Sequence, residues 1–359
     1  MNKRLLSILL VLILTMTTLL IGCGGNETGD DADADVFKVA IVANQKFGDN
    51  GPMDSIAEGA DRAAAEFGIE LKKLESASAA NFEDDIRAMS EAGYDLIITT
   101  FGYMTEATKM ISKEYPDTKY AAIFQDINAE GTDGVYENIW GSEFRGASAF
   151  YVDGYIAGMA TKTNKIGLII GAEEAGPNSE GNGFMRGVKA ANPNANIEFA
   201  FVGSYEDPAK AKEIASAMIA KGCDIIQTDC GATDTGVVEA AKEDGTVLVM
   251  GCITDYYDMY AGFVGEISMG FGDNSYDAIK MAYEGNFPGG TSGIRDITNN
   301  GYYLDWPEYE RFSKEHAARG ADFVPILKVA KELEVQILDG TLIIDYDTTA
   351  PNWSRIKSE

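Results

Sequence analysis

The segments FKVAIV (37–42), DSIAEGADRAAAEF (54–67), Gly68 and IELKKL (69–74) together decide the fold class of this chain. The first is a short apolar run with two valines and one isoleucine, which is typical of a strand buried in a parallel sheet. The second has apolar residues three and four positions apart, and the glycine after it is typical of a helix end. A strand, a helix and a second strand in this order predict a β-α-β unit with parallel strands.

The same alternation continues along the chain and predicts an α/β fold with two doubly wound, parallel-sheet lobes. We expect the first lobe to comprise 36–141 plus about 262–290, and the second 142–261 plus part of 291–359. The strand 263–267 and the helix 271–284 are expected to return to the first lobe, so several chain crossings would form a multi-strand hinge. Further predicted helices are 81–92, 105–114, 143–162, 181–191, 207–221, 233–242 and 324–338. Further predicted strands are 95–100, 119–124, 165–170, 197–202, 223–228, 246–250, 301–304 and 342–345.

Composition excludes several functions of the 359-residue chain. Lys and Arg total 29 against 57 Asp and Glu, a formal net charge of −28, and no basic cluster is present, so no nucleic acid partner is expected. A single histidine and four cysteines without a C-x-x-C pair exclude common zinc sites. The chain has no G-x-S-x-G motif and no phosphate-binding loop. We therefore predict no enzyme, no metal and no cofactor, and we interpret Cys223, Cys230 and Cys252 as buried small hydrophobes.

The first 35 residues are typical of an export signal rather than of a folded domain. Lys3 and Arg4 precede an apolar run, and the run ends in Leu20-Ile21-Gly22-Cys23. This ending resembles a bacterial lipobox, so 1–22 is predicted to be a cleaved signal peptide and Cys23 to carry a lipid anchor with palmitate. Residues 23–35 are acidic and predicted to form a flexible tether. An uncleaved membrane helix is the alternative.

Ligands of open parallel sheets bind beyond the carboxyl ends of the strands, and two facing lobes would bring these ends to one cleft. The candidate ligand-binding residues are therefore those that follow the predicted strands. They lie at 44–50, 101–103, 125–126, 172–176, 204–205, 229–233 and 254–256.

Three longer motifs resemble one protein family: SEFRGASAFYVDGYIAGM (142–159), GSYEDPAKAKE (203–213) and DIIQTDCGATDTGVVEAAK (224–242). They are similar to the basic membrane protein (BMP) family of substrate-binding lipoproteins, which includes purine-nucleoside receptors of ABC importers. The resemblance covers roughly 37–288. It implies a type I periplasmic-binding-protein-like fold with an interlobe cleft. It also implies a monomeric, lipid-anchored receptor on the extracytoplasmic face of the cell membrane, which delivers a purine nucleoside to an ABC permease without catalysis.

The resemblance assigns ligand contacts to several positions of this chain. Asp49, with Asn50 beside it, keeps the acid of the family's first cleft loop, and Asp126 matches a second cleft acid. Asp255 matches an acid expected on a sugar hydroxyl, and Gly231 keeps a glycine-rich turn. A carboxylate can accept two hydroxyl hydrogens of a ribose diol.

The chain departs from the family at the two aromatic walls that would enclose the base. Pro52 and Met53 stand in place of Phe-Asn, Gln227 stands in place of the second wall, and Met269 lies near a family lysine. Gln227 could read a base with its amide instead. Aromatic residues that could replace the walls are Phe47, Phe101, Tyr103, Tyr205 and Tyr256.

These departures leave other functions open. The ligand could be a free purine base or another small polar solute such as a sugar. The receptor could instead be a ligand sensor that partners a membrane kinase, and a two-lobe enzyme would require a catalytic constellation that the sequence lacks.

Overall fold

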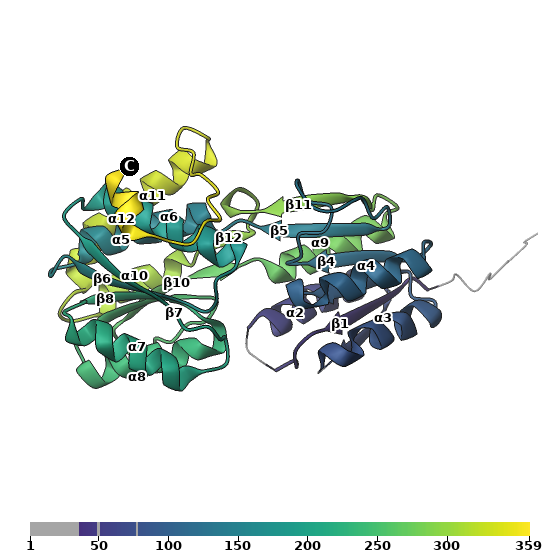
Figure 1. Cartoon of the computed structure of the whole chain (residues 1–359), viewed down its shortest axis with the longest axis horizontal. Helices are drawn as coiled ribbons and strands as arrows, with labels where there is room; N and C mark the ends of the chain where they lie inside the picture. Colours follow the sequence, from purple (N-terminus) through teal and green to yellow (C-terminus); the bar gives the residue numbers. More distant parts are fainter. Residues whose placement is uncertain (1–35, 49–50, 77) are drawn as a thin grey trace, which may run out of the picture. The chain divides into compact units, whose positions relative to one another are not determined.

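The computed structural model describes residues 36–48, 51–76 and 78–359, and from Phe37 onward they form two α/β lobes (Figure 1). The predicted signal peptide, the tether and Cys23 lie outside the described residues, as do Asp49 and Asn50. No helix in the described part of the chain is long and apolar enough to cross a membrane.

The first lobe is built on a six-stranded sheet in the order β11-β5-β4-β3-β1-β2, with every neighbouring pair parallel. Its strands are buried because helices cover both faces: α2 packs beside α9 on one, and α3 beside α4 on the other. The strands are β1 (Lys38–Ala43), β2 (Glu70–Glu75), β3 (Leu96–Thr100), β4 (Lys119–Ile123), β5 (Ile139–Phe144) and β11 (Thr291–Arg295). The helices are α2 (Pro52–Phe67), α3 (Phe82–Glu91), α4 (Thr105–Glu114) and α9 (Phe271–Tyr283).

The second lobe is built on a sheet in the order β12-β10-β9-β8-β6-β7, parallel except for the edge strand β12. Helices α7 and α8 cover one face, whereas α5 and α6 cover the other (Figure 1). The strands are β6 (Lys165–Ile170), β7 (Asn196–Phe201), β8 (Ile225–Asp229), β9 (Leu248–Cys252), β10 (Phe263–Met269) and β12 (Tyr302–Leu304). The helices are α5 (Ala147–Ala160), α6 (Ala175–Ala191), α7 (Pro208–Ala220), α8 (Asp234–Asp244), α10 (Trp306–Glu315), α11 (Gly320–Leu338) and α12 (Trp353–Ser358).

Within the described residues, the chain crosses between the two sheets at three places, which we call the hinge crossings. They are the links from β5 to α5, from β10 to α9 and from β11 to β12. The crossings are tied together by backbone hydrogen bonds: Arg145 donates to the Arg295 carbonyl (2.8 Å), and Gly270 donates to the Gly301 carbonyl (3.0 Å). A Cβ at Gly270 would lie 2.0 Å from the Asn300 oxygen, so only glycine allows this close approach.

Three expectations about these boundaries are wrong. The strand predicted to return to the first lobe, 263–267, is β10 and pairs with β9 in the second sheet; the chain crosses only after it, before α9. The predicted helix 143–162 begins at Ala147, because Ile139–Phe144 is the strand β5 of the first sheet. The predicted strand 342–345 has no strand partner; this segment runs instead along α6, where Asn178 and Asn182 donate to carbonyls just beyond it.

A buried carboxyl group makes the stability of the second lobe depend on pH. Asp153 of α5 is fully buried and accepts a hydrogen bond from the Tyr309 hydroxyl (2.8 Å). Burial raises the pKa of Asp153 to about 8. The native state therefore holds a proton that the unfolded chain, with an ordinary aspartate pKa of about 3.9, has already lost at neutral pH.

We predict that Asp153→Asn flattens the pH dependence of the unfolding free energy. The stability from this proton is fully present below about pH 4 and is lost as the pH rises towards 8, with a slope of up to about 1.4 kcal/mol per pH unit. Urea unfolding of both proteins between pH 5 and 9 measures the difference. Equal slopes in the two proteins would show that Asp153 does not hold this proton.

Candidate functional site

Strained backbone marks the carboxyl ends of three strands. Phe101 follows β3 with φ 59°, Phe124 follows β4 with φ 57°, and Ile253 follows β9 with φ 71°. Positive φ is uncommon for bulky side chains and costs about 1–3 kcal/mol per residue. Such strain persists only where the surroundings hold it, and it clusters at functional sites. These strand ends are therefore candidates for a functional site.

Five aromatic rings pack from these strand ends to the hinge crossings, and we call them the hinge aromatic cluster: Phe101, Phe124, Phe144, Phe271 and Tyr302. Ring centroids lie 5.2 Å apart for Phe101 and Phe124, 5.3 Å for Phe124 and Phe144, and 4.9 Å for Phe144 and Phe271. Tyr302 of β12 lies 6.0 Å from Phe144. Because its members come from both sheets and from α9, the cluster joins the cores of the two lobes.

A cavity of about 250 Å³ opens beside the hinge aromatic cluster, and we call it the cleft cavity. One wall comes from the carboxyl ends of the first sheet, and the other comes from the first turn of α6 and from Tyr346 near the C-terminus. Gly176 of α6 lies near Phe124, since a Cβ there would be 3.9 Å from the ring. The lining residues are Gly102, Thr105, Phe124, Gln125, Asp126, Phe144, Glu174, Ala175, Gly176, Pro177 and Tyr346.

The cleft cavity is acidic. Two carboxylates line it, Asp126 and Glu174, and no lysine or arginine is among the described lining residues. Partial desolvation at the cavity and the neighbouring Glu143 raise the pKa of Asp126, and partial desolvation raises the pKa of Glu174. The nearby Arg145 is engaged in a bidentate pair with Glu143, with N–O distances of 2.7 and 2.9 Å. The cavity therefore disfavours anionic solutes and suits neutral or cationic ones.

Hydrogen-bond donors complement these carboxylates. The first turn of a helix leaves its N–H groups without intrahelical acceptors, and the first turn of α6 presents Ala175 and Gly176 to the cleft cavity. The cavity thus places N–H donors and carboxylate acceptors around aromatic faces. This combination can bind a flat ring that has both donor and acceptor edges.

A buried carboxyl pair lies in the second lobe next to the hinge. Glu180 of α6 is buried and accepts a hydrogen bond from the Tyr302 hydroxyl (2.6 Å). Burial and the adjacent Asp229 raise the pKa of Glu180 well above its usual value, and burial raises the pKa of Asp229. The two carboxyl groups share a hydrogen bond. We infer that Glu180 is the protonated member and donates this bond to Asp229. The pair thereby joins α6, β8 and the hinge strand β12.

Two of the predicted site residues lie at or beside the cleft cavity. Asp126 lines it, and the Phe101 ring packs against Phe124, which lines it, with the two ring planes tilted by 44°. The neighbouring Gln125 also lines the cavity, but its amide is held inside the first lobe. Its nitrogen donates to Thr99 (2.9 Å), and its oxygen accepts from Thr105 (3.3 Å).

Other predicted site residues have different surroundings in the second lobe. Gln227 is fully buried within β8, where its amide donates to the Gly251 carbonyl (3.2 Å). Both carboxylate oxygens of Asp255 are bound by Arg311 (2.8 and 3.0 Å). Although partial burial opposes it, this guanidinium lowers the pKa of Asp255. Tyr256 packs edge-on against Phe263, with centroids 5.7 Å apart.

The remaining candidates serve turns and packing in the described structure. Phe47 packs against the core, and its N–H donates to Glu75 (3.1 Å). Gly231 has φ 59° and begins a short 3₁₀ turn.

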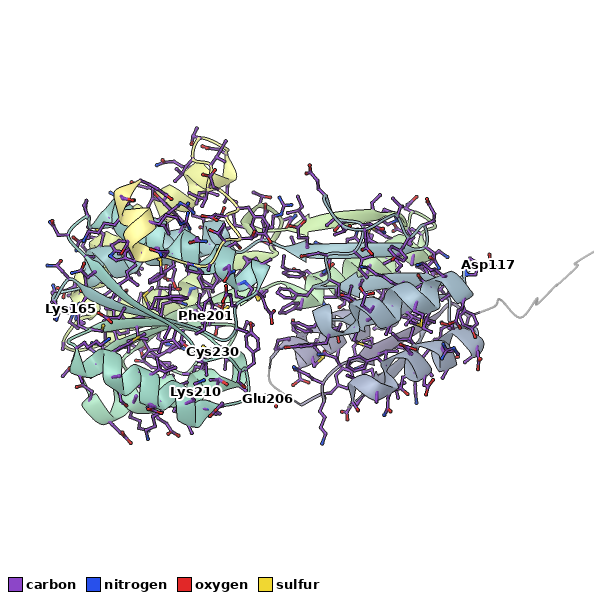
Figure 2. All side chains as sticks on the ribbon, in the orientation of Figure 1. Asp117, Lys165, Phe201, Glu206, Lys210 and Cys230 are labelled. Atoms are coloured by element: carbon purple, nitrogen blue, oxygen red, sulfur yellow. The ribbon has the colours of Figure 1, made fainter. Side chains whose placement is uncertain are left out.

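The cysteines and two further tyrosines lie elsewhere. Cys230 is buried beside the second sheet, as Figure 2 shows, and Cys223 and Cys252 are also buried and unpaired. Tyr103 is 65% exposed. Tyr205 is half-buried over Gly171, where a Cβ would lie 2.2 Å from its ring.

Glu174, Ala175 and Gly176 line the cavity from within the predicted range 172–176. The lining residues outside the predicted ranges are Thr105, Phe124, Phe144, Pro177 and Tyr346. Phe124 directly follows β4 and could have been found from that position. Phe144 falls within a segment expected to be helical, and Tyr346 lies about 200 residues further along the chain. Neither carries a local sequence signal for the cavity.

Comparison with known proteins identifies the family. The sequence model described as "Bmp: ABC transporter substrate-binding protein PnrA-like" matches residues 36–348. The chain belongs to this family. Basic membrane protein A of Borreliella burgdorferi is 30% identical over 246 residues, 68% of this chain and 69% of that protein. The ABC transporter nucleoside-binding protein BmpA of Lactococcus lactis subsp. cremoris is 27% identical over 333 residues, 85% of this chain and 92% of that one.

A solved structure agrees with the fold. The crystal structure of ABC transporter system solute-binding proteins from Aeropyrum pernix K1 matches with a TM-score of 0.73 at 22% identity, covering 90% of this chain and 98% of that chain. The predicted family and the type I periplasmic-binding-protein-like fold are confirmed. As a member of the Bmp family, the protein is a substrate-binding protein of ABC transporters and not an enzyme, so its partners are a small-molecule ligand and a permease.

Replacing Asp126 and replacing Asp255 should affect stability differently. Asp255→Asn removes a bidentate ion pair with Arg311 that is partly exposed, and we expect it to lower the unfolding free energy by about 0.5–1 kcal/mol. Asp126→Asn removes a carboxylate that lies near Glu143, and should leave stability unchanged or raise it at pH 7. Urea unfolding of both variants against the wild type measures this. A clear loss of stability in Asp126→Asn would indicate a structural role for Asp126.

Proposed function

We propose that the protein is the lipid-anchored receptor of an ABC importer and that it binds a purine nucleoside in the cleft cavity. The observation that carries this proposal is the composition of the cavity: aromatic faces from Phe124, Phe144 and Tyr346, the acceptor Asp126 and the helix N–H groups of α6. A purine nucleoside offers flat faces, acceptor atoms on the base and a ribose diol, so it complements the aromatic faces, the helix N–H groups and Asp126 in turn. The name of the Lactococcus lactis relative, a nucleoside-binding protein, supports the same class of ligand.

The carboxylates of the first lobe would hold the sugar. A ribose diol donates two hydroxyl hydrogens, and a carboxylate such as Asp126 accepts both at charge-assisted strength. Asp49 and, in the second lobe, Asp255 remain predicted contacts of the sugar hydroxyls. Asp49 lies outside the described residues, and Asp255 would have to exchange its Arg311 partner for a hydroxyl group.

The hinge crossings would convert binding into a signal for the permease. A solute that contacts both the first sheet and α6 interacts with both lobes only when they are close together. Binding would therefore shift the population towards a closed form, which the permease recognises as the loaded receptor.

A free purine base is the second candidate. The cleft cavity of about 250 Å³ lies below the volume of about 300–1,000 Å³ that is usual for ligand pockets, and this favours a ligand without the sugar.

We predict that purine nucleosides raise the melting temperature of the purified protein, whereas nucleoside 5′-monophosphates do not. The phosphate would enter a cavity lined by Asp126 and Glu174, which repel it. Thermal shift and calorimetry with inosine, guanosine, adenosine, the free bases, ribose and the monophosphates measure this. Asp126→Asn should weaken nucleoside binding about tenfold, because a hydrogen bond to a charged group becomes a neutral one. If no nucleoside or base binds, the purine assignment is wrong.

We also predict that Cys23 carries the lipid, since it follows the small residue that ends the apolar run. Cells that process lipoproteins should incorporate an alkyne analogue of palmitate into the wild type and into Cys230→Ala, but not into Cys23→Ala. Mass spectrometry of the mature N-terminus should find cleavage before Cys23. Labelling of Cys23→Ala would place the lipid elsewhere.

A further inference from the structure

Residues 341–352 connect α11 to α12, and we call them the C-terminal strap. The strap has no strand or helix of its own. It passes along α6 of the second lobe, and it brings Tyr346 to the cleft cavity.

The strap is held by an anchor one residue beyond Tyr346. The side chain of Asp347 accepts hydrogen bonds from Arg186 of α6 (3.0 Å) and Arg355 of α12 (2.8 Å). Its second oxygen accepts from the Thr349 hydroxyl (2.7 Å). Although burial opposes it, these hydrogen bonds lower the pKa of Asp347, so the carboxylate stays charged and paired.

Two buried asparagines of α6 fix the backbone of the strap. Asn182 donates to the carbonyls of Asp347 (2.8 Å) and Thr349 (2.7 Å), and Asn178 donates to that of Thr348 (3.0 Å). All three acceptor carbonyls lie within three residues of Tyr346. The position of the Tyr346 side chain is therefore set by α6, the same helix whose first turn lines the cavity.

Tyr346 is half-buried and lines the cleft cavity together with Phe124 and Phe144. The Arg145 guanidinium lies 4.6 Å from the centre of its ring, and the pair that Arg145 forms with Glu143 holds that cation in place. Burial raises the pKa of the Tyr346 hydroxyl, and so do the carboxylates of Glu143 and Asp126. The phenol is therefore neutral at pH 7 and can donate a hydrogen bond.

The two positions at which the sequence resemblance leads us to expect aromatic walls supply no ring to the cleft cavity. Pro52 has no aromatic ring, and Gln227 is fully buried in the second sheet. Among the described residues that line the cavity, the aromatic ones are Phe124, Phe144 and Tyr346, and only Tyr346 comes from outside the first lobe.

We infer that Tyr346 is a specificity-determining residue, an aromatic wall that the C-terminal strap supplies from the second lobe for a flat, uncharged or cationic heterocycle. This inference rests on the proposed use of the cleft cavity for ligand binding. Asp347 is a positioning residue, because it acts on the ligand only through Tyr346.

Substitutions within the strap test this inference by calorimetry with inosine, guanosine, their free bases and ribose. Tyr346→Ala should raise the Kd for the heterocyclic ligands about tenfold, the effect of removing one stacked ring, and leave any ribose binding unchanged. Tyr346→Phe keeps the ring and should bind within about threefold of the wild type. Asp347→Asn should give an intermediate Kd, and the Ile343→Ala control, at a residue 82% exposed in the same strap, should match the wild type.

The outcomes separate this inference from the proposed function. If nucleosides bind the wild type and Tyr346→Ala equally well, Tyr346 is not an aromatic wall for the ligand, but the proposed nucleoside-receptor function is supported. A second outcome is that free bases bind, that nucleosides do not, and that Tyr346→Ala weakens base binding. In that case the nucleoside assignment is wrong, but the proposed role of Tyr346 is supported. If only ribose binds, or nothing in the panel binds, both are wrong. A loss in Tyr346→Ala that Tyr346→Phe does not restore would also overturn the aromatic wall.

Discussion

The parallel pairing of strands is the constraint on which the candidate site depends. In a parallel sheet all carboxyl ends meet at one edge, so short loops from distant parts of the sequence converge there. In the first lobe this edge holds Phe101, Phe124 and Asp126. The crossing after β5 leaves from this edge. Phe144, at the end of β5, lines the cavity and packs against Phe271, which follows the crossing after β10. A ligand at this edge is therefore next to the segments that must move when the lobes close.

Charge then selects the class of solute. The chain as a whole is strongly acidic, and the described lining of the cleft cavity carries Asp126 and Glu174 without a basic side chain. The Arg145 guanidinium near the cavity is held by Glu143 and lies against the ring of Tyr346. Recognition must thus come from hydrogen bonds to uncharged groups and from aromatic contact. A receptor for phosphorylated or carboxylated solutes would need free cations at these positions.

The sequence predicted the two sheets well, because apolar strands and amphipathic helices alternate with regular spacing. It failed where long-range contacts decide the structure. Ile139–Phe144 has no continuous apolar run, yet it is buried between two neighbouring strands. Asp126 could be found from its place after a strand. Tyr346 could not, because its position follows from the hydrogen bonds that tie the neighbouring Asp347 to Asn182 and Arg186 of α6, and not from any local pattern. The pairing of Asp255 with Arg311 likewise could not be predicted from the sequence, since 56 residues separate the two.

The most direct measurement of the central claim is a crystal structure of the protein grown with inosine. The account predicts a purine ring in the cleft cavity between Tyr346 and the rings of Phe124 and Phe144, with the ribose hydroxyls on a carboxylate of the first lobe. Density for the nucleoside at another site, or a cavity filled by the protein's own side chains in a ligand-saturated crystal, would contradict it.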